Sequence, residues 1–177
     1  MNPWLISALI VVFLVALFNS KLSIWSVIFK QKDIYKNHST KKHSVFDYYV
    51  FFAVPLIFGI VMSFSLPINV LIENASTMIT IVSIVASVLL AFLGIIIDKS
   101  KHDNETVRQV VKETFITITL NIIYALVFIA LVVVAPLLKE VDYLRNILVG
   151  FSGYLIIKFV INILMVIKRI YKIIEAD

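Results

Sequence analysis

Long runs of hydrophobic residues alternate with short polar connections along the whole chain. A bilayer with a hydrocarbon core of about 30 Å is crossed by roughly 20 apolar residues in a helix that rises 1.5 Å per residue. Five runs approach or reach this length, and they predict an all-α, polytopic transmembrane helical bundle. We place the predicted spans at residues 3–20, 48–72, 76–97, 114–138 and 147–167.

The first run, residues 3–20, is also compatible with the hydrophobic region of a secretion signal. However, the start "MNPW" carries no basic residue, and no small-x-small cleavage site follows "LIVVFLVALF". We therefore expect the run to be retained as a span. If it does not cross the bilayer, the bundle has four spans.

The composition excludes a soluble domain. The chain of 177 residues is 61% hydrophobic and 15% charged, and its mean hydropathy is +1.02, whereas soluble domains are about 45–50% apolar and 25% charged. It has no cysteine, which excludes a disulfide framework and a thiolate metal site. No repeat or long linker divides it, so we predict a single integral membrane domain, residues 1–177.

Basic residues are concentrated in alternate connections, and this asymmetry predicts the orientation. One side would hold Lys30, Lys32, Lys36, Lys41, Lys42, Lys99, Lys101, Arg108, Lys112, Lys168, Arg169 and Lys172. The other side would hold only Lys139 and Arg145. Because lysine and arginine resist translocation, the N-terminus is predicted outside and the C-terminus in the cytoplasm of a multi-pass membrane protein.

The predicted cytoplasmic segments are residues 30–47, 98–113 and 168–177, and almost nothing protrudes on the other side. A cytosolic protein partner would therefore dock on the first two segments, or their charges would bind anionic lipid at about 1 kcal/mol each. The residues predicted to make these contacts are Lys30, Lys32, Lys36, Lys41, Lys42, Arg108 and Lys112. Since orientation explains the net charge of +5, direct nucleic-acid binding is not expected.

Two features predict how the helices begin and end. In "DNETVRQVVKETF", three valines lie on one side and Arg108, Gln109 and Lys112 on the other, which predicts that the fourth span starts as an amphipathic stalk. Pro55, Pro67 and Pro136 predict kinks or ends, because proline has no backbone N–H to donate.

Small and hydroxyl residues form a stripe along the third predicted span. Ser76, Thr80, Ser83, Ser87 and Gly94 recur at helical spacing and share one sector of the helix. Such residues let helix backbones approach closely, which predicts a packing seam. The same stripe also suits the lining of a wet lumen in an oligomer.

The fourth predicted span carries a similar sector that contains Thr117, Asn121 and Tyr124. An unpaired amide in lipid costs several kcal/mol, so Asn121 must face protein or water. We expect spans three and four to form an antiparallel hairpin whose polar sectors meet each other or a neighbouring subunit.

Lys158 lies within the fifth predicted span, beside Tyr154 and Asn162. It is about 17 Å of helix from Ile147, near the bilayer centre, where a lysine costs about 2.5–3.5 kcal/mol. No acidic residue is predicted at its depth. Lys158 would therefore bond hydroxyls, Asn121 or backbone carbonyls within the bundle, or the fifth span would sit lower in the bilayer than we place it. The functional alternative is a ring of lysines around a pore axis.

Catalytic equipment is absent from the sequence. There is no phosphate-binding glycine loop, no H-E-x-x-H, and no ligand spacing around His38, His43 or His102. We predict no catalytic, cofactor-binding or metal-binding residue. The protein is expected to be a non-enzymatic oligomeric scaffold or sensor, or alternatively a pore-forming effector or small channel or transporter with a Ser/Thr- and Lys-lined path.

The segments "TIVSIVASVLLAFLGIIIDKS" and "VRQVVKETFITITLNIIYALVFIALVVVAP" give the chain a family resemblance. It resembles small multi-spanning membrane proteins of bacterial anti-phage operons, such as the KwaA-type membrane subunit of the Kiwa system. That subunit is expected to have four spans rather than five. The resemblance implies an oligomeric inner-membrane protein in antiviral defence that recruits a cytosolic effector and couples a membrane disturbance to it.

Overall fold

The computed structural model describes residues 46, 49–99, 105–138 and 142–175, and all of these except Leu66, Pro67 and Asn74 are helical. The elements are η1 (Tyr49–Ala53), α4 (Val54–Ser65), α5 (Ile68–Glu73), α6 (Ala75–Lys99), α7 (Glu105–Leu138) and α8 (Asp142–Glu175). The predicted span 3–20 and the predicted contact residues from Lys30 to Lys42 lie outside the described residues. The all-α class is confirmed for the described part of the chain.

Within the described part of the chain, three helical segments are long and apolar enough to cross a bilayer. They are Ala75–Ile97, Val107–Leu138 and Leu144–Tyr171, and they contain the predicted spans 76–97, 114–138 and 147–167. The chain therefore has the helices of a membrane protein, and the third, fourth and fifth predicted runs are each continuous helix.

The second predicted span, residues 48–72, is wrong as one continuous helix. The apolar helix Tyr49–Ser65 ends before Pro67, which is only about 25 Å of helix at 1.5 Å per residue. Leu66 is extended, with φ −113° and ψ 128°, as expected for a residue before proline. The predicted end at Pro67 is therefore confirmed, whereas Pro55 lies in the first turn of α4 and Pro136 in the last turn of α7.

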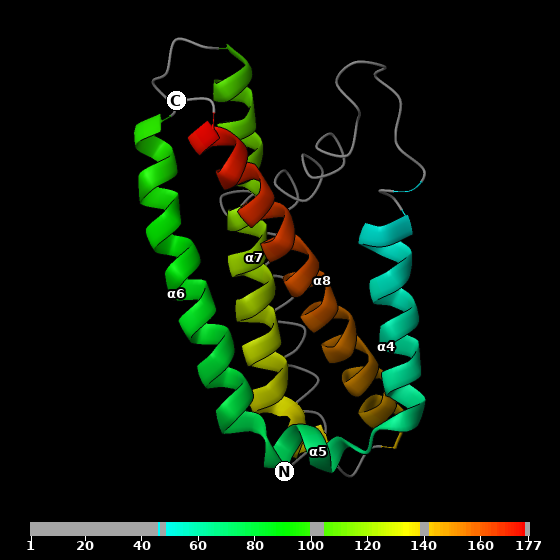
Figure 1. Cartoon of the computed structure of the whole chain (residues 1–177). Helices are drawn as coiled ribbons and strands as arrows, with labels where there is room; N and C mark the ends of the chain where they lie inside the picture. The colour runs from blue at the N-terminus through cyan, green and yellow to red at the C-terminus, as the bar shows by residue number, and fades with distance from the viewer. Residues whose placement is uncertain (1–45, 47–48, 100–104, 139–141, 176–177) are drawn as a thin grey trace, which may run out of the picture.

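The long helices pack as antiparallel neighbours (Figure 1). Helix α8 lies between α4 and α7, α6 packs against the other side of α7, and the short α5 crosses the end of the bundle where α4 turns into α6. Only 11% of the apolar window of α6 is buried, compared with 39% in α7 and 44% in α8. Helix α6 is thus peripheral among the described helices.

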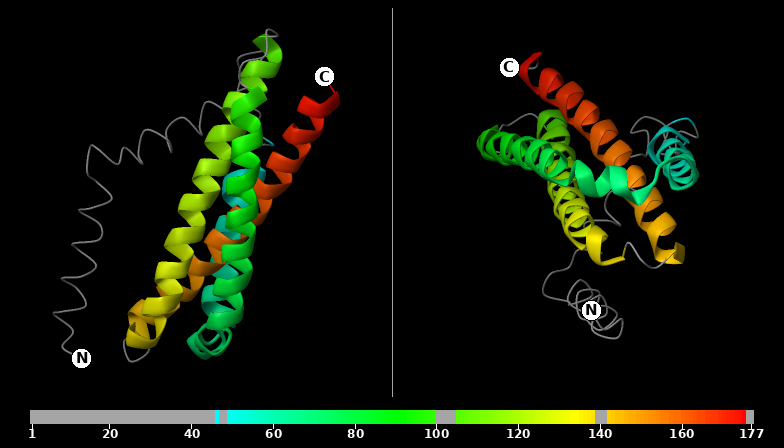
Figure 2. Two further views of the ribbon diagram at one scale, coloured as in Figure 1. Left: turned by 90° about the vertical axis from the view of Figure 1, so that its left-hand side faces the viewer. Right: turned by 90° about the horizontal axis from the view of Figure 1, so that it is seen from below.

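The first turns of α7 extend beyond the ends of α6 and α8, as Figures 1 and 2 show. In these turns Val107 and Val111 are buried, whereas Arg108 and Lys112 are exposed. The predicted amphipathic stalk is therefore present, and its charged side faces outward.

Candidate functional site

Glycines allow α4 and α8 to cross at very close range. A Cβ atom added to Gly59 would lie 2.6 Å from the carbonyl oxygen of Gly150, and one added to Gly150 would lie 2.9 Å from the Cβ of Ser63. Such contacts between small residues are typical of helix packing in membranes, where no aqueous hydrophobic effect drives association. This crossing fixes the face of α8 that carries Tyr154, whose ring stacks on Phe151 at 6.1 Å.

Lys158 is enclosed within the chain, with only 1% of its surface exposed. Its Nζ donates a hydrogen bond of 2.7 Å to the carbonyl oxygen of Phe51, and it lies 3.9 Å from the centroid of the Phe52 ring. The carbonyl and the ring face both carry negative partial charge, so together they stabilise the ammonium. The sequence allowed hydroxyls, Asn121 or backbone carbonyls as partners of Lys158. The structure shows a backbone carbonyl, that of Phe51.

Pro55 explains why that carbonyl suits a lysine. In a regular α-helix the carbonyl of Phe51 would accept from the N–H of residue 55, but proline has none. The backbone forms a π-helical turn, η1, immediately before α4, and such turns recur at functional sites. Lys158 from α8 thus donates to a carbonyl that is followed, at the i+4 position, by proline rather than by a residue with a backbone N–H.

Buried polar side chains also line the interface of α7 and α8. Thr114 and Thr117 donate to the carbonyls of Val110 and Glu113, at 2.6 Å and 2.8 Å, so each is satisfied by its own helix. Asn121 is fully buried, and its Nδ2 reaches across to the carbonyl of Phe159 at 3.5 Å. Asn121 was expected to face protein or water, and in the structure it faces protein, namely α8.

An ion pair joins the same two helices near one end. Arg169 lies 3.2 Å from Glu113, with side chains 13% and 19% exposed, and its Nη1 donates to Thr117 at 3.0 Å. Gln109 donates to the other carboxylate oxygen of Glu113 at 3.3 Å. Sequence reasoning missed this pair, although Glu113 directly precedes one apolar run and Arg169 closely follows another, which places them at one level in antiparallel helices.

The stripe on α6 faces away from α7. Thr80 and Ser87 are exposed and donate to the carbonyls of Ser76 and Ser83, at 2.8 Å and 2.9 Å. A Cβ atom added to Gly94 would meet nothing within 4 Å. The polar sectors of α6 and α7 therefore do not meet within one chain, and the expected contact with a neighbouring subunit stays a prediction.

An apolar groove of about 290 Å³ lies along α7 between α6 and α8. It is lined by Met78, Val82, Tyr124, Phe128, Phe159, Ile163 and further apolar residues. Of the predicted polar residues only Tyr124 takes part, so the groove offers hydrocarbon contacts rather than a site for polar chemistry.

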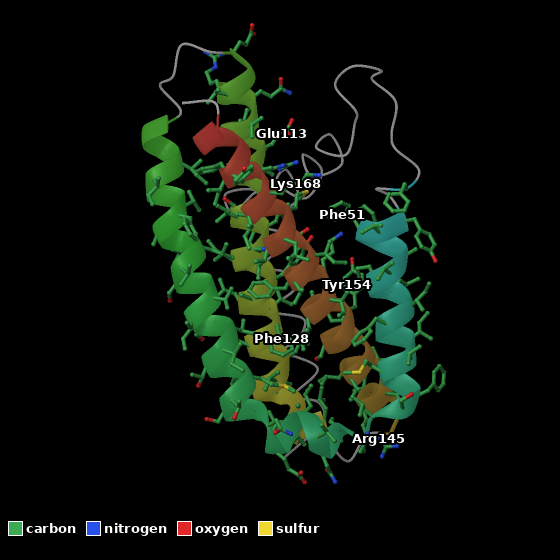
Figure 3. The ribbon with its side chains drawn as sticks, viewed as in Figure 1. Phe51, Glu113, Phe128, Arg145, Tyr154 and Lys168 are labelled. Atoms are coloured by element: carbon green, nitrogen blue, oxygen red, sulfur yellow. The ribbon has the colours of Figure 1, made fainter. Side chains whose placement is uncertain are left out.

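The charged ends of the bundle are shown in Figure 3, where Glu113 and Lys168 lie towards one end and Arg145 at the other. Comparisons of the chain with protein-family models, with curated proteins and with solved structures gave no match.

Proposed function

We propose that this chain is a non-enzymatic membrane scaffold or sensor that assembles with copies of itself and docks a cytosolic partner. The observation that carries the proposal is the division of polar groups between the helices. Lys158 and Asn121 are enclosed within one chain, whereas Thr80, Ser87 and Gly94 face outward from α6. Small residues on a helix surface allow another helix to approach closely, so α6 is suited to contact α6 of a second copy.

We propose that the cytosolic partner docks at the end of the bundle where α7 projects. Arg108, Lys112 and Lys168 are exposed there, and Arg145 is at the other end (Figure 3). By the positive-inside rule the end with more lysine and arginine belongs in the cytoplasm. A projecting helix with exposed cations would dock an acidic partner surface, and the resemblance to Kiwa-type membrane subunits supplies anti-phage defence as the context.

Assembly is tested by the molar mass of the purified protein in detergent. We expect the double variant Thr80→Leu/Ser87→Leu to shift the protein towards the monomer, because two bulky side chains would keep α6 helices apart. Ile81→Leu, on another exposed face of α6, is the control and should leave the mass unchanged. If the unaltered protein, the double variant and Ile81→Leu all had the same molar mass, the proposed contact between α6 helices of two copies would be contradicted.

Docking is tested by co-purification with the product of a neighbouring gene. Arg108→Glu/Lys112→Glu should reduce recovery of the partner at least tenfold, because both cations would repel an acidic surface. Arg145→Glu is the matched control at the opposite end. Recovery that depends on Arg145 instead would reverse the proposed orientation.

The row of outward hydroxyls on α6 also favours a second candidate, a pore or small transporter whose lumen is built from α6 helices. In that case purified protein in liposomes would release a trapped dye, and Ser87→Leu would stop the release. For Lys158 to take part, its Nζ would have to leave the Phe51 carbonyl, to which it lies at 2.7 Å. If the protein is a scaffold, we expect no release of the dye under any condition that preserves the bundle.

A further inference from the structure

Two buried asparagines, one on α7 and one on α8, carry amide atoms without a hydrogen-bonding partner among the described residues. Asn121 and Asn162 are both fully buried. The Oδ1 of Asn121 and both side-chain polar atoms of Asn162 have no partner among the described residues. The remaining bond, from Asn121 to the carbonyl of Phe159, is long at 3.5 Å.

The side-chain amides of Asn121 and Asn162 lie close to each other along α8. Phe159 and Asn162 are three residues apart on α8, hence on adjacent turns of the same face. Because Asn121 bonds to the carbonyl of Phe159, its amide lies at the turn that precedes Asn162. Ser152 also has a hydroxyl without a partner in the described part of the chain. However, it is ten residues away, about 15 Å along the helix, and a serine can bond its own helix by rotating. An asparagine at this position has no such easy alternative.

Leaving amides unpaired in a membrane interior is costly, at several kcal/mol for each group. A second protein chain cannot supply the missing partners, because both side chains are fully enclosed and the helices would have to separate. A molecule of the size of water can, since buried waters typically make about three hydrogen bonds to such groups.

A sequence of polar groups connects this location with one end of the bundle. Asn121 is one turn from Thr117, which accepts a hydrogen bond from Arg169 at 3.0 Å. Arg169 and its partner Glu113 are partly exposed, at 13% and 19%. One turn beyond Asn162 in the other direction lies Lys158. Polar atoms thus follow each other from the partly exposed ion pair to the depth of the buried lysine.

We propose that the α7–α8 interface holds a short file of water molecules that enters beside Glu113 and Arg169 and solvates Asn121 and Asn162. Water-sized polar species, and protons carried by the water, would then reach the depth of Lys158 from this end. This inference does not depend on scaffolding or on assembly, because all the groups belong to one chain.

The test uses silver ion, which is close to water in size and reacts with thiols that water reaches. The chain has no cysteine, so each single-cysteine variant reports one position. Asn162→Cys is compared with Val160→Cys, which lies at almost the same depth but on a face that is 45% exposed outside the bundle. We expect Asn162→Cys in sealed vesicles to react at least tenfold faster than Val160→Cys.

Equal rates for the two cysteines would overturn the proposal. Silver ion is added to each side of the vesicles in turn, and Lys112→Cys identifies the side that bears the ion pair. Reaction of Asn162→Cys from the opposite side alone would overturn the proposed entrance.

A second measurement uses the unaltered protein, because Asn162→Cys could disturb folding. In water-edited solid-state NMR of the chain in bilayers, the side-chain amide of Asn162 should receive magnetisation from water as that of the exposed Asn146 does. A dry interface would give no transfer to Asn162, and that result would refute the water file.

Discussion

The crossing of α4 and α8 allows a sharp prediction about Gly59. In Gly59→Ala the new methyl group would lie 2.6 Å from the carbonyl oxygen of Gly150 and 3.1 Å from the Cβ of Tyr154. These neighbours are backbone and the first atom of a side chain, so neither can move without moving α8. The helices must therefore separate by several tenths of an ångström.

The magnitude follows from a comparison with Gly94→Ala. Both substitutions gain the same helix propensity, roughly 0.5–1 kcal/mol, whereas only Gly59→Ala meets a close neighbour, since nothing lies within 4 Å of a Cβ at Gly94. Overpacking a tight contact typically costs about 1–3 kcal/mol. Because the propensity term cancels, we expect Gly59→Ala to be less stable than Gly94→Ala by about 1–3 kcal/mol.

The free energy of unfolding is measured by titrating the protein in mixed micelles with a denaturing detergent and following tryptophan fluorescence or helicity. Gly150→Ala should resemble Gly59→Ala, because its methyl would meet the Cβ of Ser63 at 2.9 Å and the carbonyl oxygen of Gly59 at 3.0 Å. If Gly59→Ala and Gly94→Ala had equal stability within about 0.5 kcal/mol, α4 and α8 would not cross at this distance in the protein.

Three further predictions concern the polar contacts. Lys158→Glu should release η1 from α8, because a carboxylate would face the carbonyl of Phe51, and hydrogen exchange over Tyr49–Ala53 should rise; Lys158→Met, which keeps the apolar stem, should have a smaller effect. A double-mutant cycle of Glu113→Gln and Arg169→Gln should give a coupling energy of about 1–2 kcal/mol, and additive effects would show that the pair contributes nothing. Asn121→Ala should reduce stability by about 1–3 kcal/mol through the lost contact with Phe159 and the space left behind, whereas an unchanged midpoint in the same titration would count against this contact between Asn121 and α8.

The parts of the fold that follow from hydropathy and from helical periodicity could be predicted from the sequence. Length and hydropathy predicted the three long helices of the described part of the chain, because an apolar run of more than 20 residues has few alternatives in a bilayer. The alternation of valines with Arg108 and Lys112 predicted the exposed and buried sides of the α7 stalk. Pro67 correctly predicted a helix end, but hydropathy alone hid the interruption, because Leu66 and Ile68 keep the local average high.

The site depended on contacts between distant residues, which periodicity does not report. The sequence showed that Lys158 and Asn121 needed partners but could not choose between carbonyls, hydroxyls and a second subunit. The choice is made by the glycine crossing, which brings η1 to Lys158, and by the register of α7 and α8, which pairs Glu113 with Arg169. A proline inside one apolar run, together with a lysine inside another, is a signal that a sequence search can look for.

In the proposed assembly the enclosed polar groups belong to one chain, and α6 presents its small residues to another. Disulfide formation in native membranes by the single-cysteine variant Ser87→Cys tests this most directly, with Val88→Cys as the control on a different exposed face of α6. We expect a covalent dimer for Ser87→Cys and little or none for Val88→Cys. Efficient cross-linking through Val88 but not through Ser87 would contradict it.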